Sequence, residues 1–368
     1  MFPPLKPFQE EALKALKTCD HTVLIAQTGS GKSLVFQKYL YDSRKSARSI
    51  LVSPLNALAR QLADGFERFG LTVHLGVGKN GAPPPDRSGV WIVSPEKIMG
   101  RAFEQALRWQ PNCLMVDEAH CVWEWGESFR PEFAQVPHLV QRLEIQKSFW
   151  CSATLPRPAL RCIENALPGP VHKIGRFSVP VGLELERISV SAHHKLARLR
   201  ALLDEEPLQS GMIFVSTRAS AERLQFYLSE WGFQSLFYHA GMSNEERVII
   251  EKRLVVHDPL QPIWVVATSA FGMGMNYAFL KRCILFEPTR TLLSLAQAIG
   301  RVGRSGALAR AQVFWHENDF LGMEARITDQ EQRGRLREVY RWCASSECPR
   351  SNLENYFNET EKSGTFDG

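Results

Sequence analysis

The chain has 368 residues, of which 44% are hydrophobic and 23% are charged, and 44 Lys and Arg against 39 Asp and Glu give a formal net charge of +5. At about 100–200 residues per domain, this length predicts about two domains, each with its own core. The plentiful aliphatic residues and nearly balanced charges exclude a disordered chain, a collagen-like repeat and a supercharged tail. The small positive excess permits a polyanionic partner without requiring one.

No apolar segment marks a leader or a membrane anchor. Residues 1–6 lack the apolar core of a signal peptide, and no run reaches the roughly 18–20 apolar residues of a membrane span. The eight cysteines are scattered and form no C-x-x-C pair, which favours a reducing compartment over a disulfide framework. We therefore expect a cytoplasmic protein with no membrane partner, associated with the nucleoid if its source is bacterial.

Five short apolar runs in the first half of the chain end in polar or small residues. Stretches with helical spacing separate them, as in residues 55–69, where Leu55, Leu58, Leu62 and Phe66 recur every three or four positions. Such runs predict a parallel sheet covered on both faces, whose ligands bind at the carboxyl ends of the strands. The predicted strands are 22–26, 49–53, 90–94, 113–117 and 148–152.

Helix- and strand-breaking residues gather at 168–170 and again at 175–180, as expected of a linker. The pattern of apolar runs resumes after it, so we predict an α/β fold class with two tandem domains, each a parallel sheet flanked by helices. The predicted domains are 1–175 and 176–325, followed by a short helical tail at 326–368. The predicted strands of the second domain are 211–215, 263–267, 282–286 and 311–315.

Residues 26–33, AQTGSGKS, directly follow the first predicted strand and open a helical pattern. Glycines let backbone N–H groups surround phosphate oxygens, and the helix N-terminus adds a positive dipole. Lys32 is expected to reach the β- and γ-phosphates, and the Ser33 hydroxyl to hold Mg²⁺. Ala26 stands where the strict pattern has Gly, so the alternative is a Gly-rich turn that happens to contain Lys. We expect ATP and Mg²⁺ to bind, with nucleotide contacts from Thr28, Gly29, Ser30, Gly31, Lys32 and Ser33.

The tetrapeptide Asp117-Glu118-Ala119-His120 ends the fourth apolar run. Asp117 is expected to hold the hydration shell of Mg²⁺, and Glu118 to orient and deprotonate the attacking water. Adjacent carboxylates alone are more often a solvated strand exit, and the phosphate loop favours the catalytic interpretation. His120 is either an ordinary polar tip or a link to the second domain.

With both motifs present, the chain from about Leu5 to Asn358 resembles the superfamily 2 helicases, and among them the RecQ-like DNA helicases. The resemblance implies two RecA-like P-loop domains. Residues 6–9 look like the family's adenine-recognition motif, with Gln9 placed to pair with the base edge and Lys6 where the family usually has Arg. Residues 152–154 match the motif that couples ATP hydrolysis to strand movement.

Residues 121–133, CVWEWGESFRPEF, are similar to the aromatic-rich loop that follows the acidic motif in RecQ proteins. Aromatic rings interleaved with a guanidinium make a platform for stacked bases and a cation for phosphate. Such a loop would report nucleic acid binding to the neighbouring carboxylates. The alternative is a buried aromatic cluster. The DNA contacts expected in this segment are Trp123, Trp125, Phe129 and Arg130.

Residues 297–306, QAIGRVGRSG, look like the last motif of the family. The resemblance makes Arg304 the arginine finger, Arg301 a supporting contact and Gln297 a coupler to the nucleotide. Two guanidiniums three residues apart share one side of a helical turn.

Three further segments of the second domain match motifs of the family. Residues 267–276 resemble a motif that touches both ATP and the nucleic acid backbone, and 216–218 and 238–242 match strand-end phosphate contacts. The implied ATP contact is Gly274, and the implied DNA contacts are Ser216, Arg218, His239 and Thr268.

Residues 341–359 are similar to the start of the family's zinc-binding region. Cys343 and Cys348 alone cannot form a four-ligand zinc site, so no zinc is expected. The winged-helix domain of many relatives has no counterpart in these residues. ATP hydrolysis and translocation are therefore predicted on stronger grounds than duplex unwinding.

The resemblance implies an ATP-dependent DNA helicase or translocase that moves 3′-to-5′ on single-stranded DNA, in repair or recombination. Its expected partners are single-stranded and tailed duplex DNA, with single-strand-binding or repair proteins as candidates, and a monomer is expected. One alternative is an RNA-directed DEAH-box motor. Another is a nucleic acid-binding protein with a vestigial nucleotide site, against which Lys32, Asp117, Glu118 and Arg304 argue.

Overall fold

The structure, a computed structural model of the chain, divides into two compact units. The first comprises the chain up to Ser178 together with Phe357 and Asn358, and the second comprises Val179–Tyr356. The described residues are 2–43, 47–76, 87–125, 130–258, 260–269, 271, 277–303 and 306–358.

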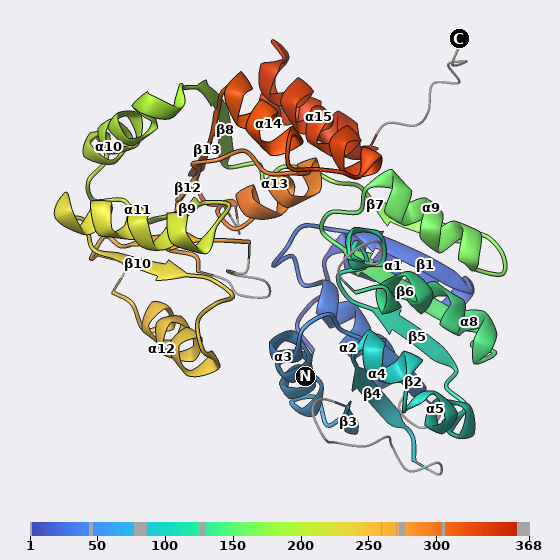
Figure 1. Cartoon of the computed structure of the whole chain (residues 1–368). Coiled ribbons are helices and arrows are strands. Elements are labelled where there is room, and N and C mark those ends of the chain that lie inside the picture. Colours follow the sequence, from blue (N-terminus) through green and yellow to red (C-terminus); the bar gives the residue numbers. More distant parts are fainter. Residues whose placement is uncertain are drawn as a thin grey trace, which may run out of the picture. The chain divides into compact units, whose positions relative to one another are not determined.

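The described part of the first unit contains a seven-stranded sheet in which every neighbouring pair is parallel (Figure 1). The strand order is β3-β4-β2-β5-β6-β1-β7. Strands β1 and β5 are buried along their whole length, and β2 and β6 at all but their first residue, as expected for a sheet with helices on both faces. The strands are β1 (His21–Ile25), β2 (Arg48–Val52), β3 (Val73–Gly76), β4 (Gly89–Val93), β5 (Cys113–Val116), β6 (Lys147–Ser152) and β7 (Val171–Gly175).

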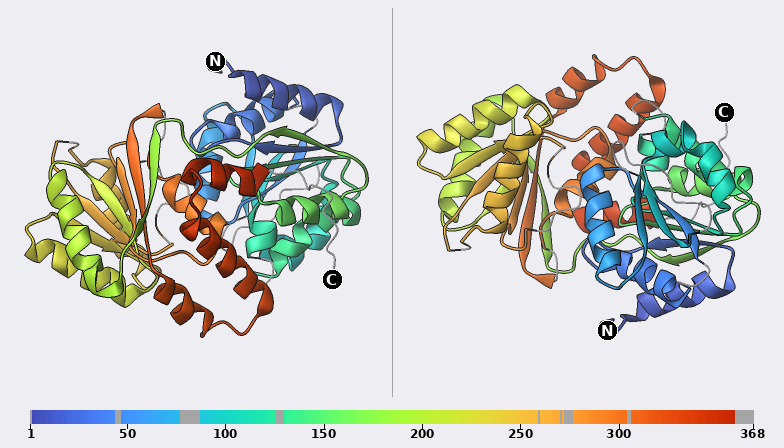
Figure 2. Two further views of the ribbon diagram at one scale, coloured as in Figure 1. Left: turned by 90° about the horizontal axis from the view of Figure 1, so that it is seen from above. Right: turned by 90° about the horizontal axis from the view of Figure 1, so that it is seen from below.

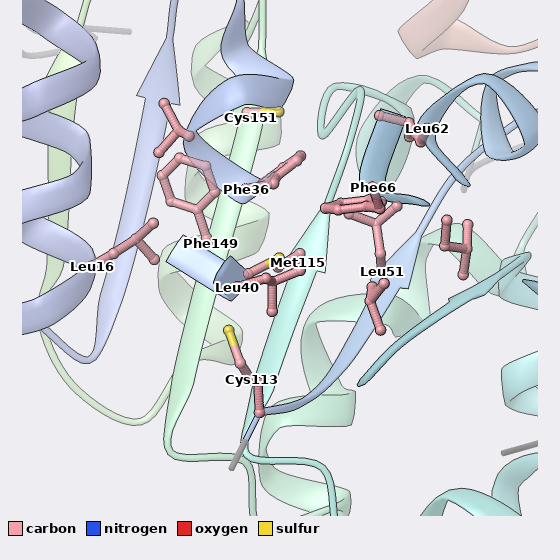
Figure 3. Close-up of a cluster of buried hydrophobic side chains, with 14 of the residues drawn as sticks. Leu16, Phe36, Leu40, Leu51, Leu62, Phe66, Cys113, Met115, Phe149 and Cys151 are labelled. Carbon is pink, nitrogen blue, oxygen red and sulfur yellow. The ribbon is translucent and has the colours of Figure 1, made fainter. Parts of the chain in front are cut away.

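Alternate residues of these strands pack against three of the helices to form the core of the first unit. Leu51, Met115 and Phe149 meet Phe36 and Phe66 there, and all five side chains are fully buried (Figure 3). The 3.6-residue period predicted for 55–69 is confirmed, because Leu58, Leu62 and Phe66 all face the interior. The helices are α1 (Pro7–Thr18), α2 (Lys32–Asp42), α3 (Asn56–Glu67), α4 (Pro95–Met99), α5 (Phe103–Trp109), α6 (Cys121–Glu124), α7 (Glu132–Gln135), the 3₁₀ turn η1 (Val136–His138), α8 (Leu139–Arg142) and α9 (Arg157–Ala166).

The second unit contains a six-stranded sheet within the described ranges, again parallel throughout, in the order β10-β11-β9-β12-β13-β8. Helices cover both of its faces (Figures 1 and 2). The strands are β8 (Leu183–Ser189), β9 (Gly211–Phe214), β10 (Ser235–Tyr238), β11 (Trp264–Ala267), β12 (Arg282–Leu285) and β13 (Ala309–Trp315). The helices are η2 (Ala192–His194, a 3₁₀ turn), α10 (Lys195–Glu205), α11 (Arg218–Glu230), α12 (Asn244–Val255), α13 (Leu292–Ile299), α14 (Glu317–Glu324), α15 (Gln330–Ala344) and α16 (Pro349–Asn358).

The two parallel sheets confirm the predicted α/β fold class. The sequence did not predict β7, which lies between the breaker-rich residues 168–170 and 175–180 and pairs with β1. As an edge strand, β7 exposes His172 and Lys173, so it lacks the apolar run that marks a central strand. Residues 326–356, which the sequence set apart as part of a tail, lie in the second unit.

The cysteines form no disulfide, and five of the eight are buried. Within the described ranges, no helix is both long and apolar enough to cross a membrane.

Candidate nucleotide site and nucleic acid contacts

Three neighbouring strands of the first sheet bring the predicted nucleotide motifs together. Strand β6 pairs with β1 on one side and with β5 on the other, all in parallel. The phosphate loop follows β1, Asp117–His120 follow β5, and Ser152 ends β6. Parallel strands end at the same edge of a sheet, so motifs up to 126 residues apart in sequence meet there.

The phosphate loop has the backbone that a phosphate cradle requires. Gly29 and Gly31 have φ angles of 76° and 96°, in the left-handed region that favours glycine. Lys32 is buried, and its Nζ donates to the carbonyl oxygens of Ala26 and Gln27 at 3.0 and 3.2 Å. The buried Ser30 Oγ has no hydrogen-bond partner within the described part of the chain. The loop therefore presents a cation, an unused hydroxyl and a helix N-terminus to one place, which suits a phosphate.

The residues expected to recognise adenine contact this loop directly. Gln9 Nε2 donates to the carbonyl oxygen of Gly31 at 2.8 Å, and Lys6 Nζ donates to that of Ser30 at 3.2 Å. A Cβ at position 31 would lie 2.7 Å from Gln9 Nε2, so only glycine leaves room for this approach. Gln9 is itself oriented by a bond from Lys6 N to its Oε1 at 2.7 Å.

Asp117 is half-buried, beside the carboxylate of Glu118 and the ammonium of Lys32. Burial is the largest cause that raises its pKa, and the Glu118 carboxylate adds to it, while Lys32 acts in the opposite direction; the pKa reaches about 6. The Cys151 thiol donates to Asp117 Oδ1 at 3.3 Å, and the backbone N–H of Glu118 donates to the same oxygen at 3.0 Å. A bound divalent cation would restore the charge balance of this carboxylate.

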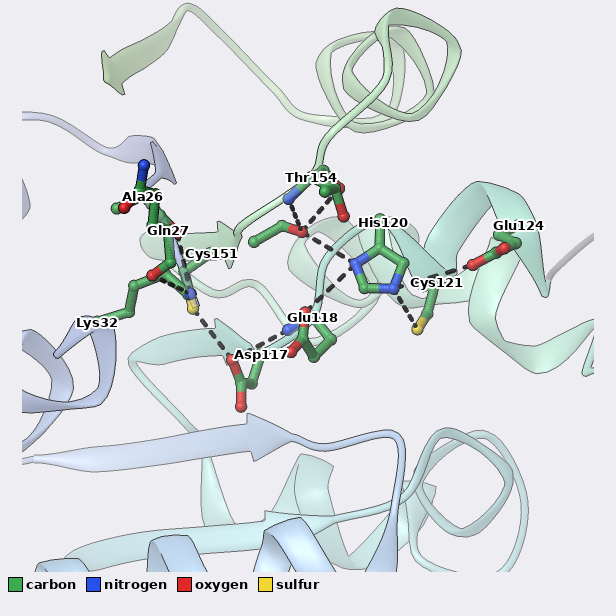
Figure 4. A network of polar contacts seen from close by, with 11 residues as sticks. Ala26, Gln27, Lys32, Asp117, Glu118, His120, Cys121, Glu124, Cys151 and Thr154 are labelled. Atoms are coloured by element: carbon green, nitrogen blue, oxygen red, sulfur yellow. Dashed lines mark hydrogen bonds and ion pairs between the residues drawn. The ribbon is translucent and has the colours of Figure 1, made fainter. Parts of the chain in front are cut away.

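His120 joins the acidic motif to the end of β6 (Figure 4). The single proton of the Ser152 hydroxyl is directed at the carbonyl oxygen of Thr154 at 2.8 Å, so Ser152 Oγ accepts from His120 Nδ1 at 2.9 Å. Nδ1 therefore carries hydrogen, and it also lies 3.3 Å from Glu118 Oε2. The same N–H thus faces both the expected base and the coupling motif. His120 is buried, and its other ring nitrogen lies 3.6 Å from Cys121 Sγ.

The donor set fits ATP with Mg²⁺. The Ser33 hydroxyl at the start of α2 and the Asp117 carboxylate at the end of β5 are hard oxygen ligands of the kind that Mg²⁺ prefers. The Ser30 hydroxyl, which no described residue pairs with, and the Lys32 ammonium suit phosphate oxygens.

The aromatic-rich segment divides between core and surface. Trp123 is only 7% exposed, so its ring does not offer a face for a stacked base. Trp125 is half-buried and meets Phe133 edge-on, with ring centroids 5.5 Å apart. The guanidinium of Arg130 lies over both rings, 5.3 Å from the Trp125 centroid. Phe129 lies outside the described residues.

Arg130 already has partners in the first unit. Its Nε and Nη2 bond the carboxylate of Glu96, and its Nη1 bonds the carbonyl oxygen of Pro54. Arg130 thereby joins the rings of Trp125 and Phe133 to α4 and to the residues after β2. Contact with a phosphate requires that Glu96 release part of this guanidinium.

In the second unit, the predicted DNA contacts gather at the carboxyl edge of the sheet. Ser216 follows β9, and its N–H donates to Glu287 Oε2 at 2.8 Å. Arg218 opens α11 and packs against Gly241, and Thr268 follows β11. His239 follows β10, and its Nε2 lies 2.9 Å from Glu222 Oε1. The four side chains thus lie on neighbouring strand ends, as the sequence predicts.

The remaining predicted residues of the second unit are described only in part. Gln297 lies in α13 and Arg301 follows it, and both are partly exposed. Arg304 and Gly274 lie outside the described residues.

The two cysteines of the zinc-like segment have different environments. Cys343 is buried in α15, and burial raises the pKa of its thiol to about 12. Cys348 is exposed just before α16, where hydrogen bonding from Ser351 lowers the pKa of its thiol. Over the described ranges, no three or more His, Cys, Asp and Glu side chains come together as metal ligands would.

Sequence reasoning missed several contacts of this site. The Cys151 thiol on Asp117 and the Glu96 carboxylate on Arg130 involve residues 34 positions apart in both cases. The only local signal was that Cys151 adjoins the Ser152–Thr154 motif at the end of a strand next to β5.

Two family models match the chain in tandem. A DEAD/DEAH box helicase model matches residues 6–162, and a helicase conserved C-terminal domain model matches residues 194–306. The matched ranges fall in the first and second unit, respectively.

Curated relatives and solved structures resemble the chain over most of its length. The ATP-dependent DNA helicase RecQ of Haemophilus influenzae is 28% identical over 95% of this chain and 58% of its own length, and that of Bacillus subtilis is 23% identical over 96% and 62%. The chain thus spans about six tenths of these relatives. Saccharomyces cerevisiae Dbp5 bound to RNA and ADP BeF3 superposes with a TM-score of 0.67 at 19% identity, over 90% of this chain and 88% of that one. Mycobacterium smegmatis helicase Lhr bound to ssDNA and AMP-PNP superposes with a TM-score of 0.63 at 21% identity, over 92% of this chain and 48% of that one. The solved structures establish the tandem RecA-like fold.

We expect the affinity for ATP with limiting Mg²⁺ to fall as the pH drops through about 6, where Asp117 has its raised pKa. Asp117 is ionised above that pH and protonated below it, and only the ionised form attracts the metal. Excess Mg²⁺ should move the fall to lower pH because metal and proton compete. Calorimetric titrations between about pH 5 and pH 7.5 would measure the effect.

Asp117→Asn is the matched control for this measurement. Protonation of ATP itself affects both proteins equally. The variant should therefore bind ATP with Mg²⁺ weakly, and its affinity should change with pH only as far as the protonation of ATP requires. Identical pH profiles for the two proteins would contradict the assignment of Asp117.

Proposed function

Because the chain belongs to the RecQ-like DEAD/DEAH box helicases, we propose that it is an ATP-driven motor that moves along single-stranded DNA and separates duplex strands. The observation that carries the proposal is the meeting of Lys32, Asp117 and Ser152 at three neighbouring strand ends of the first sheet. A fortuitous Gly-rich turn would not bring with it two half-buried carboxylates and a buried histidine that lies close to both Glu118 and Ser152.

The residues of the first unit divide the work of hydrolysis. Lys32 moves from the carbonyl oxygens of Ala26 and Gln27 to the phosphates of ATP. Ser33 and Asp117 would hold Mg²⁺, which would supply positive charge to offset that of the phosphates. Glu118 orients the attacking water and accepts its proton.

His120 connects this chemistry to the coupling motif. Its Nδ1–H lies between Glu118 Oε2 and Ser152 Oγ. A movement of either acceptor therefore changes the strength of the hydrogen bond to the other. We propose that it orients Glu118 for proton transfer and passes a change at Glu118 to the end of β6. The motif at 152–154 is the one that resembles a link between hydrolysis and strand movement.

Two groups of side chains are proposed to hold DNA. In the first unit, Trp125 offers a ring for stacking, and Arg130 offers a cation if Glu96 releases it. In the second unit, Ser216, Arg218, His239 and Thr268 are proposed to hold backbone phosphates at the sheet edge. The resemblance also assigns Arg304 as the arginine finger, supported by Gln297 and Arg301, and this assignment stays a prediction.

The finer parts of the proposal rest on the resemblance alone. They are 3′-to-5′ movement, a role in repair or recombination, action as a monomer in the cytoplasm, and contact with single-strand-binding or repair proteins. The RNA-directed alternative has less support, because the likeness to Dbp5 concerns the fold, whereas the curated relatives that match most of the chain are DNA helicases.

We expect single-stranded DNA to stimulate ATP turnover by at least about tenfold more than an RNA of the same sequence, since each tenfold preference requires only about 1.4 kcal/mol. Steady-state phosphate release with oligo(dT) and oligo(rU) would measure this preference. Lys32→Ala should abolish turnover with either polymer. Equal or greater stimulation by RNA would overturn the DNA assignment, and turnover by Lys32→Ala would overturn the assignment of the site.

For polarity, we expect a duplex with a 3′ single-stranded tail to be opened and one with a 5′ tail to stay closed. Movement toward the 5′ end of the loaded strand reaches the junction only in the first substrate. Strand displacement followed by fluorescence would measure it, with AMP-PNP in place of ATP as the control. Opening of the 5′-tailed duplex alone would reverse the assigned direction.

For the histidine relay, we expect His120→Ala to lower kcat for ATP by about tenfold with little change in KM, because Glu118 loses an orienting donor while phosphate contacts remain. Ser152→Ala leaves the His120 N–H to Glu118, so it should spare ATP turnover and lower strand displacement. Ser152→Thr keeps the hydroxyl and is the control. Equal losses of both activities in Ser152→Ala would show that Ser152 does not act in coupling.

A further inference from the structure

The segment between β7 and β8 lies along one face of α16. It carries Phe177 and Val179, which are buried, and Pro180, which has no N–H to donate. On the helix, Leu353 and Phe357 are buried, and the Phe357 ring lies against that of Phe177 with centroids 4.3 Å apart. The segment is therefore held by packing as well as by the polar contacts below.

Three side chains of α16, spaced four residues apart, bind the backbone of this segment. Asn358 pairs with both backbone groups of Phe177, accepting its N–H at 3.0 Å and donating to its carbonyl oxygen at 2.8 Å. Glu354 Oε1 accepts the N–H of Val179 at 2.9 Å. Residues at i, i+4 and i+8 share one helix face, so their side chains form a row of hydrogen bonds to the backbone of the segment.

Arg350 completes this row. Its Nη1 donates to the carbonyl oxygen of Val179 at 2.8 Å, and its Nη2 lies within hydrogen-bond distance of those of Pro180, Val181 and Leu183, at 2.8, 3.4 and 2.6 Å. A planar guanidinium is the side chain suited to several acceptors at once, and a lysine ammonium would reach fewer of them. Arg350 Nη1 also lies 3.7 Å from Glu354 Oε1, and this ion pair holds both side chains on the same face of α16.

The helix that carries this row is itself anchored within the second unit. Arg187 of β8 donates to the carbonyl oxygens of Trp342, in the last turn of α15, and of Glu347, in the connection to α16. Its guanidinium also lies over the Trp342 ring, 5.2 Å from the centroid. The row on α16 is thus fixed to the start of the second sheet.

The same segment contacts the phosphate loop. Gln27 Nε2 donates to Ser178 Oγ at 3.0 Å, and Ser178 lies between the two residues whose N–H groups α16 accepts. The carbonyl oxygen of Gln27 accepts from Lys32 at 3.2 Å. Gln27 therefore joins the cation that meets phosphate to the segment that leads into the second unit.

We propose that residues 177–183, held by Arg350, Glu354 and Asn358 and joined to the phosphate loop through Gln27 and Ser178, form a positioning element that couples nucleotide binding to movement. The inference rests on the proposed function. When Lys32 leaves the Gln27 carbonyl oxygen for phosphate, the Gln27 side chain shifts its hold on Ser178. The three side chains of α16 hold residues 177–183 rigidly. A shift at Ser178 is therefore transmitted to β8 and is not lost in local movement of the segment. Arg350, Asn358 and Ser178 are positioning residues that touch no substrate.

The first test measures coupling. Arg350→Leu should leave DNA-stimulated ATP turnover within about twofold of the wild type and lower the base pairs opened per ATP by about tenfold, since it removes several charged hydrogen bonds from the segment alone. Arg350→Lys should fall between the two. The matched control is Arg337→Leu on α15, whose exposed guanidinium pairs only with Glu324 among the described residues and which should keep the wild-type ratio. An unchanged ratio in Arg350→Leu would overturn the inference.

The second test needs no turnover. Amide hydrogen exchange of Phe177 and Val179 should be slow in the wild type and should change when AMP-PNP with Mg²⁺ binds. Ser178→Ala should remove the change caused by the nucleotide, and Ser178→Thr, which keeps a hydroxyl, should restore it. The inference fails if Ser178→Ala responds as the wild type does. A wild type that neither hydrolyses ATP nor opens duplex, yet shows the nucleotide-dependent exchange, would instead refute the proposed function.

Discussion

The parallel pairing of β6 between β1 and β5 is the constraint on which the candidate site depends. It sets Ile25 opposite Ser152 and Val116 opposite Trp150, so the chain leaves all three strands at one edge. The phosphate loop, the two carboxylates and the Ser152 hydroxyl then need no further structure to meet. A shift of β6 by one residue would turn its side chains to opposite faces and separate Ser152 from His120.

The charged groups of the site suit a ligand that combines negative phosphates with a positive metal ion. Lys32 is buried on carbonyl oxygens, which solvate an ammonium less well than phosphate does, and burial raises the pKa of Asp117. Burial disfavours the charged form of Asp117. On the proposed function, a phosphate beside Lys32 and a metal ion beside Asp117 would compensate the charges of both groups, so binding energy would go into assembling the charged site.

The sequence was informative where a strand was buried on both faces and uninformative where contacts depend on register. Apolar runs located β1, β5 and β6, and their polar ends located Lys32 and Asp117. The edge strand β7 exposes His172 and Lys173, so it has no apolar run, and it was not predicted. Residue type did not tell the buried Trp123 from the half-buried Trp125, because the difference arises from a short helix that turns one ring inward. The bonds of His120 to Ser152 and of Arg130 to Glu96 follow from strand order, which no local pattern contains.

Residues 341–358 illustrate how one segment can support two interpretations. Their resemblance to the start of a zinc-binding region rests on residue type, with the cysteines as its most distinctive members. In the fold, Cys343 is buried and Cys348 is exposed. Arg350, Glu354 and Asn358, in contrast, share one face of α16 and bind the backbone that leads into β8. The four-residue spacing that places them there is a property of the helix. It would hold the linker segment in the same way with or without a metal nearby, because every acceptor and donor in the row belongs to the chain itself.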